Sequence, residues 1–309
     1  MRLKKYFGVM LFSLMLLAGV VLFKPATTAY AEVKIATTTP PAALVADNYT
    51  TIDTAYNWGS YIDGKSTSTV ILPANVDVAY FKFTVNSGDK IYTRCSYDSD
   101  YEGMYMELYD STGTKVYSAT SPSDVKNPTS AIPFLAVNCD GTRSSQAFYV
   151  KVARGSKYDE NQPMYFTLNL YNRIKTGSGT FNFSGTAKNT GNTSLSSSGV
   201  NSTILKLDLT GNTNIPSGAI VTSVTTKSVQ SPSQGNVHHM IMPAQPGKWY
   251  TSKVSSATSG SYNISITDGI LVGQVWQFEY NALATGSSTM SSVAINFNWQ
   301  YDISKNNYK

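Results

Sequence analysis

The chain has 309 residues, of which 41% are hydrophobic, 12% are aromatic and only 14% are charged. Globular proteins contain about 25% charged residues, so this surface depends on Ser, Thr, Asn, Gly and Tyr rather than on ions. The 21 tyrosines and 22 glycines favour β-sheets, and the composition excludes collagen, coiled coils and wholesale disorder.

Residues 1–31 have the three parts of a secretory signal peptide. A basic start is followed by 18 largely apolar residues from Tyr6 to Phe23, and Ala29-Tyr30-Ala31 places small residues where a signal peptidase reads them. We therefore expect cleavage after Ala31 and a secreted, extracellular protein. An uncleaved membrane anchor is the alternative, because an apolar stretch of this length approaches what a bilayer requires.

The positive net charge of the chain belongs mostly to this first segment. Removing residues 1–31 takes away four basic residues and no acidic one, so 20 Lys and Arg remain against 19 Asp and Glu. A charge near zero gives no general attraction to nucleic acid or to anionic lipid. We expect no nucleic-acid partner and no membrane contact beyond the signal peptide.

The remainder of the chain divides into segments of different composition. Residues 32–47 are rich in Thr, Pro and Ala, which predicts a flexible linker. The segments that follow are a strand-rich block over 48–172, a linker over 173–178, a second strand-rich block over 179–304 and a tail over 305–309. The predicted fold is all-β, with two jelly-roll-like β-sandwich domains in tandem after the signal peptide.

Hydrophobic alternation identifies individual strands in both blocks. In the first block, apolar residues occupy every second position of Val78–Val85, Met104–Tyr109, Phe148–Ala153 and Phe166–Leu170. Such a pattern places one side of a strand in the core and the other in water. The predicted strands of the second block are Thr180–Phe183, Ile204–Leu209, Ala219–Thr225, Val237–Met242, Tyr262–Ile266, Val275–Tyr280 and Ser292–Ile303.

The first block also carries a recurring set of turns and strands. Leu108-Tyr109-Asp110 with Gly113 forms an L-Y-D-x-x-G hairpin, and Tyr149 precedes Val150 and Val152 in a late strand. In these features residues 50–172 resemble the bacterial pre-peptidase C-terminal (PPC) domain. The resemblance implies a small β-sandwich with an accessory role, since some members of that family bind polymers such as collagen and others aid secretion.

Cys95 and Cys139 are the only two cysteines of the chain. Both lie at predicted strand ends or in the adjoining loops, and such a pair is usually oxidised outside the cytosol. We expect a disulfide between them, which would stabilise the fold by roughly 3–4 kcal/mol. Two free buried thiols are the alternative.

Residues suited to metal binding or catalysis are sparse. Asp98, Asp100 and Glu102 resemble the start of a calcium loop, although Tyr109 stands where an EF-hand needs a bidentate glutamate. A calcium site of another geometry and a solvated acidic loop both remain open, and no other cofactor is expected. His238 and His239 are adjacent, so on a strand they point to opposite faces and cannot easily share a metal ion. We expect one to point inward and the other outward.

The tyrosines offer the best candidate for a binding surface. Tyr105 and Tyr109 share one side of a strand whose other side carries methionines and Leu108, so methionines in the core would leave these tyrosines exposed. Together with Tyr101 and Trp58 they predict a platform of rings that can stack on sugars or prolines. Tyrosine that merely decorates the solvent face of a sheet is the alternative.

These observations lead to one functional hypothesis with two alternatives. We expect a secreted, non-enzymatic β-sandwich protein that acts as an extracellular binding or structural module for a polymer or a protein surface. The first alternative is an accessory or targeting partner of an exported hydrolase such as a peptidase. The second is a hydrolase that uses His238 or His239 with acids assembled by folding.

Overall fold

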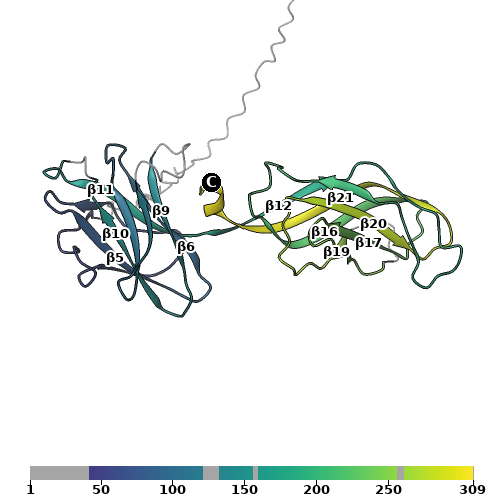
Figure 1. Cartoon of the computed structure of the whole chain (residues 1–309), viewed down its shortest axis with the longest axis horizontal. Coiled ribbons are helices and arrows are strands. Elements are labelled where there is room, and N and C mark those ends of the chain that lie inside the picture. Colours follow the sequence, from purple (N-terminus) through teal and green to yellow (C-terminus); the bar gives the residue numbers. More distant parts are fainter. Residues whose placement is uncertain (1–41, 121–131, 156–158, 256–260, 309) are drawn as a thin grey trace, which may run out of the picture. The chain divides into compact units, whose positions relative to one another are not determined.

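The structure is a computed structural model that describes residues 42–120, 132–155, 159–255 and 261–308 (Figure 1). Within these ranges the chain forms strands and a single 3-10 turn, and it contains no helix long and apolar enough to cross a membrane. The prediction of an all-β fold is confirmed. The predicted signal peptide at 1–31 and most of the predicted linker at 32–47 lie outside the described residues. At the end of that linker, β1 (Leu44–Val45) pairs in parallel with β4 (Val70–Leu72).

The first sandwich consists of two sheets around one core. Its other strands are β2 (Tyr56–Ser60), β3 (Lys65–Ser66), β5 (Val78–Val85), β6 (Lys90–Tyr97), β7 (Tyr105–Asp110), β8 (Lys115–Thr120), β9 (Phe134–Asp140), β10 (Gln146–Ala153) and β11 (Met164–Asn172). One sheet has the order β1-β4-β11-β6-β9, with β3 also paired to β11, and the other has the order β2-β5-β10-β7-β8. The apolar rows of the alternating strands meet between the sheets, where Phe81, Met106 and Leu168 are fully buried.

The second sandwich repeats this arrangement with its own core. Its strands are β12 (Ile174–Asn182), β13 (Ala187–Asn189), β14 (Val200–Asn201), β15 (Leu205–Asp208), β16 (Ile220–Ser231), β17 (Val237–Pro243), β18 (Tyr250–Thr251), β19 (Tyr262–Ile264), β20 (Val275–Ala282) and β21 (Ser288–Asp302). One sheet has the order β12-β21-β16-β19, with β13 on β21, and the other has the order β14-β20-β17-β18, with β15 on β20. Val293, Ile295 and Phe297 of β21 are fully buried, as their alternation predicts.

The predicted linker at 173–178 is wrong, because most of it belongs to strand β12. This strand pairs with β21 along its whole length, and Figure 1 shows the two running side by side. Gly177 lies opposite Trp299, and a Cβ atom there would come within 2.6 Å of the indole nitrogen. A Cβ at Gly179 would come within 3.0 Å of the same ring. The glycines that resemble a linker in the sequence instead make room for a large side chain.

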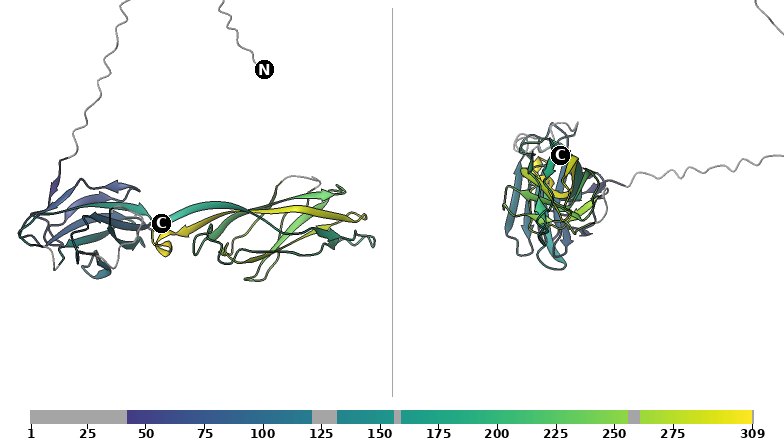
Figure 2. Two further views of the ribbon diagram at one scale, coloured as in Figure 1. Left: turned by 90° about the horizontal axis from the view of Figure 1, so that it is seen from above. Right: turned by 90° about the vertical axis from the view of Figure 1, so that its right-hand side faces the viewer.

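The predicted tail at 305–309 is also corrected, since residues up to Tyr308 are packed. Asp302 caps a 3-10 turn, η1 (Ile303–Asn306), and its side chain accepts a hydrogen bond from the Ser304 amide at 2.9 Å. The Tyr308 hydroxyl donates to the Asn138 side chain at 2.7 Å, and its ring centre lies 4.8 Å from that of Tyr92. Figure 2 shows this end of the chain beside the start of β12.

Arg173 fixes the short connection between β11 and β12. Its buried guanidinium pairs with Asp302 at 2.8 Å and with Asp140 at 2.6 Å, and its backbone amide donates to the carbonyl of Lys90 at 2.8 Å. Charge-assisted hydrogen bonds of this kind are stronger than neutral ones when they are shielded from water. One residue therefore ties the connection to β6, β9 and the end of β21.

The predicted disulfide between Cys95 and Cys139 is wrong, and both thiols are free and buried. In the antiparallel pair β6 and β9, Cys139 lies opposite Ile91 and Cys95 lies opposite Leu135. The two cysteines are thus four positions apart along neighbouring strands, or about 13 Å at the rise of a β-strand. A disulfide requires Cα atoms within roughly 7 Å of each other. The pairing register, which the sequence does not show, decides the outcome.

We expect two thiols per chain to react with a thiol reagent after unfolding without reductant, and neither to react readily in the folded protein. Burial raises the pKa of both thiols, which keeps them protonated and unreactive. Absorbance of the released reagent anion before and after denaturation measures both quantities. A sample that yields no thiol until it is reduced would contradict the register described above.

Candidate functional site

Tyrosine and lysine side chains cover the outward side of the sheet β2-β5-β10-β7-β8. On β7, Met106 and Leu108 are fully buried, whereas Tyr105 and Tyr109 lie half-buried on the opposite side, so the predicted orientation of this strand is confirmed. Strands β5 and β10 contribute further residues to that side. We call the set the tyrosine–lysine face, and its members are Tyr80, Lys82, Tyr105, Glu107, Tyr109, Tyr149 and Lys151.

Strand register interleaves rings and charges across this face. Tyr149 of β10 lies opposite Lys82 on one side and Tyr109 on the other. Lys151, two residues further along, lies opposite Tyr80 and Glu107. Side chains directly opposite each other in antiparallel strands are in contact distance. Rings and charged groups therefore alternate along the strands. Across the sheet, each ring lies opposite a lysine between β5 and β10, whereas ring lies opposite ring and lysine opposite glutamate between β10 and β7.

Glu107 is the centre of a hydrogen-bonded network on this face. Its carboxylate pairs with Lys151 at 3.1 Å and with Lys115 at 3.0 Å, and it accepts a hydrogen bond from the Tyr109 hydroxyl at 2.8 Å. Burial acts to raise the pKa of Glu107, but the hydrogen bonds from Tyr109 and the two lysines outweigh it and lower that pKa. The pKa of Tyr109 rises to about 12 through burial and through its bond to Glu107. The network holds Glu107 ionised and Tyr109 neutral.

The lysines also contact the tyrosine rings. The ammonium nitrogen of Lys151 lies 5.0 Å from the ring centre of Tyr105, and that of Lys82 lies 5.8 Å from the ring centre of Tyr149. Both distances fall in the range of cation–π attraction. Rings held in this way lose little further freedom when a partner binds, which favours recognition.

The structure does not bring Trp58 and Tyr101 to this face. Trp58 is only 6% exposed and packs edge-on against Phe83 in the core, with 6.4 Å between the ring centres. Tyr101 is also 6% exposed, and its hydroxyl accepts a hydrogen bond from the Tyr165 amide at 3.0 Å. The prediction of one platform that includes Trp58 and Tyr101 is therefore corrected.

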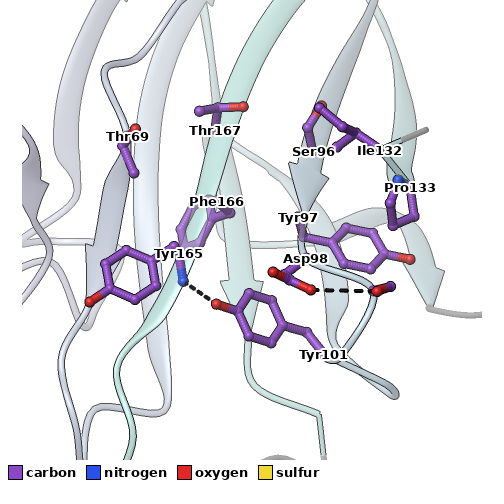
Figure 3. A pocket seen from close by; sticks show the side chains of 11 residues that line it. Thr69, Ser96, Tyr97, Asp98, Tyr101, Ile132, Pro133, Tyr165, Phe166 and Thr167 are labelled. Atoms are coloured by element: carbon purple, nitrogen blue, oxygen red, sulfur yellow. Dashed lines mark hydrogen bonds between the residues drawn. The ribbon is translucent and has the colours of Figure 1, made fainter. Parts of the chain in front are cut away.

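Tyr101 instead lines a hollow beside strands β6 and β11, with a volume of about 540 Å³. Figure 3 shows the rings of Tyr97, Tyr101 and Tyr165 around it, with Asp98 at one side. Tyr165 is 45% exposed, whereas Tyr97 is buried. The hollow thus has an aromatic floor with polar groups at its edge, and its remaining lining residues are Thr69, Ser96, Ser99, Ile132, Pro133, Phe166 and Thr167.

The acidic residues proposed for calcium are not drawn into one cluster in the described part of the chain. No group of three or more His, Cys, Asp or Glu side chains is placed to hold a metal ion there. The Asp98 carboxylate accepts a hydrogen bond from the backbone amide of Asp100 at 3.2 Å, which closes the loop locally. Asp98, Asp100 and Glu102 are therefore not gathered around a common point.

The two histidines lie on opposite sides of β17, as predicted. His239 is fully buried, and its ring nitrogens lie 2.7 Å from the Thr226 hydroxyl and 3.3 Å from the Ser228 hydroxyl. Its ring stacks on that of Tyr262, with 3.8 Å between the centres. Burial, with a smaller effect of His238, lowers the pKa of His239 to about 3, so the ring is neutral at pH 7. His238 is half-buried on the outward side.

Five members of the tyrosine–lysine face were not predicted from the sequence: Tyr80, Lys82, Glu107, Tyr149 and Lys151. Alternation assigns each of them to the solvent side of its own strand. What alternation cannot show is that β10 lies between β5 and β7, which brings the three rows together. The sequence of each strand shows which side chains face the solvent, but it does not show which strands are neighbours in the sheet.

Comparison with known proteins places the chain in a family. No family model matches it. YbdN, an uncharacterized protein of Bacillus subtilis (strain 168), is 48% identical over 253 residues, which cover 82% of this chain and 86% of that protein. The chain belongs to the YbdN family.

Two solved structures show a weak similarity to this member of the YbdN family. The pre-peptidase C-terminal domain of collagenase from Bacillus anthracis is 14% identical, with a TM-score of 0.27, over 38% of this chain and 93% of that domain. A Eubacterium rectale protein is 11% identical, with a TM-score of 0.36, over 76% of this chain and 74% of the other.

We expect His239 to make the protein less stable in mild acid. In the unfolded chain a histidine gains a proton below about pH 6.5, whereas the folded protein resists protonation until about pH 3. The contribution of the neutral His239 to the free energy of unfolding is therefore complete above pH 6.5. It is lost as the pH falls, by roughly 2–3 kcal/mol between pH 6.5 and pH 4.5. Denaturant unfolding of the wild type and of His239→Gln at both pH values measures it.

The informative quantity is the pH dependence rather than the stability at one pH. His239→Gln should unfold more easily at pH 7 but lose less stability on acidification than the wild type. His238→Gln, which changes the half-exposed neighbour, should retain most of the wild-type pH dependence. Equal acid losses in the wild type and His239→Gln would show that His239 is not the titrating group.

Proposed function

We propose that this protein is a secreted, non-catalytic binding module whose tyrosine–lysine face recognises an extended extracellular polymer. The observation that carries the proposal is the grouping of four tyrosine rings on three adjacent strands, held by lysines and by Glu107. Secretion rests on the signal-like residues 1–31.

The form of the face favours an extended partner over a small molecule. It is the outer surface of a sheet, where rings from different strands approach one another. For example, the ring centres of Tyr80 on β5 and Tyr109 on β7 are 6.3 Å apart, although β10 lies between these strands. Flat rings offer apolar area for stacking on sugar units, and the hydroxyl and ammonium groups beside them can donate hydrogen bonds. A chain of repeating units can use several such rings at once.

The charge of the face favours an acidic polymer. The face and the adjoining strand β8 carry three ammonium groups, those of Lys82, Lys115 and Lys151, and one carboxylate, that of Glu107, which pairs with Lys115 and Lys151. This local excess of positive charge contrasts with the near-neutral composition after residue 31. Anionic groups on a polymer would be attracted to the lysines, and this attraction would weaken as the salt concentration rises.

The position of His239 supports the non-catalytic part of the proposal. A catalytic histidine must reach the proton it transfers. His239 is sealed in the core of the second sandwich between two hydroxyl groups, and its lowered pKa makes it a poor base.

We expect Tyr105→Ala/Tyr109→Ala to weaken binding to an insoluble acidic polymer, such as cell-wall polysaccharide with its anionic chains, by about tenfold or more. Each stacked ring contributes roughly 0.5–1.5 kcal/mol beyond the area it buries. Co-sedimentation of the whole protein with the polymer, with neutral cellulose and chitin alongside, gives the affinities. The Tyr105→Phe/Tyr109→Phe variant keeps both rings and should retain most of the binding.

Tyr165→Ala is the matched control, because Tyr165 is 45% exposed in the same sandwich but lies on the other sheet. It should bind like the wild type. If both alanine variants bind like the wild type, the tyrosine–lysine face is not the binding surface. If the wild type instead retains an exported hydrolase that the double variant loses, the protein is an accessory partner of that enzyme and the polymer proposal is wrong.

A further inference from the structure

Two methionines of the second sandwich lie outside the hydrophobic cores. Six methionines follow residue 41, and four of them, Met104, Met106, Met164 and Met290, are at most 1% exposed in the two cores. The other two, Met240 and Met242, are half-buried at outward positions of β17. A methionine on the solvent side of a sheet gains little from core packing. Its polarisable sulfur, rather than its apolar area, is then the property that distinguishes it at this position.

His238 lies on the same side of the same strand. Because side chains alternate along a strand, His238, Met240 and Met242 occupy three successive outward positions of β17. The chain has two histidines, and because His239 is buried in the core, His238 is the one left on the outward side. The outward histidine and both outward methionines of the described chain thus form a single H-x-M-x-M row.

The spacing of this row allows neighbouring side chains to share an ion. Outward positions two residues apart on a strand are separated by about 6.7 Å. An imidazole and a thioether that lean toward each other over this distance can meet at a metal ion between them. Neutral imidazole and thioether sulfur both offer a lone pair for coordination, and His238 and Met240 present them from the same side of β17.

A buried acid stands across the sheet from the middle of the row. Glu279 of β20 lies directly opposite Met240 and is only 5% exposed. One of its carboxylate oxygens accepts a hydrogen bond from the Asn201 side chain at 3.0 Å. Burying a carboxylate is unfavourable unless a cation compensates its charge. A metal ion held by Met240 would supply that compensation.

We propose that His238 and Met240, with Met242 as an additional thioether ligand, bind a soft monovalent metal ion, copper(I), on the outer side of β17. Thioether ligands select copper(I) over harder ions, whereas zinc prefers imidazole, thiolate and carboxylate ligands in sets of three or four. The site lies in the second sandwich and is separate from the tyrosine–lysine face.

Silver(I), which has the same charge and softness, tests the proposal in air. In whole protein labelled with ¹³C at the methionine methyl groups, silver(I) in chloride-free buffer should shift the signals of Met240 and Met242. The signals of the four buried methionines should stay in place. Zinc(II) at the same concentration should shift none of them. Met240→Leu and Met242→Leu assign the two signals by removing them one at a time.

Copper(I) itself is measured by anaerobic competition with a chromophoric chelator. We expect Met240→Leu/Met242→Leu and His238→Gln each to weaken binding by about tenfold or more. Met164→Leu, a buried methionine of the first sandwich, should leave the affinity unchanged. The unchanged methyl signals of the core methionines serve as the check that each variant is folded.

Three results would overturn the proposal. In the first, silver(I) moves the signals of Met104, Met106 and Met164 instead, which would point to the thiols of Cys95 and Cys139 in the same core. In the second, zinc(II) produces the shifts expected of silver(I), so that the site is not selective for soft ions. In the third, the double methionine variant binds copper(I) as tightly as the wild type.

Discussion

Both sandwiches depend on one geometric rule, that successive side chains of a β-strand point to opposite sides. On β7 the rule buries Met106 and turns Tyr105 outward. On β17 it seals His239 in the core and leaves His238 outside, although the two are adjacent in sequence. A shift of one residue in either strand would exchange the two sides, so core packing and surface chemistry are fixed together.

The same rule explains how much the sequence could reveal. Alternation located β5 at Val78–Val85 without error and placed β17, β20 and β21 to within a few residues. It also predicted correctly which side of β7 enters the core. Strand order and register were beyond its reach, because they arise from contacts between residues far apart in the chain. The tyrosine–lysine face depends on strand order, and the failure of the predicted disulfide depends on register.

Local composition gave wrong predictions where the residue type is explained by a contact with a distant part of the chain. The stretch with Gly177 and Gly179 looks like a linker. Its glycines instead leave space for the ring of Trp299, which is more than a hundred residues away in the sequence. Trp58 looked like a surface aromatic and is part of the core, where it packs on Phe83. In both cases the sequence shows which residues are present but not which side chain fills the space beside them.

The two sheets of the first sandwich have different outer sides. One carries the tyrosine–lysine face. The other presents Tyr92, Phe134 and Ala136, which form a small apolar cluster with Ile303 and Tyr308. Tyr92 and Phe134 are therefore covered by the chain's own C-terminal turn, whereas Tyr165 on the same sheet stays exposed. This division explains why aromatic content alone could not locate a binding surface.

The separation of Cys95 and Cys139 on neighbouring strands has a consequence for biogenesis. Neither sandwich contains a covalent cross-link between described residues, so the folded state rests on packing, hydrogen bonds and ion pairs alone. Its formation requires no oxidase or disulfide isomerase, and glutathione has no bond to cleave. The native structure thus contains no sulfur–sulfur bond whose formation depends on the redox state of its surroundings.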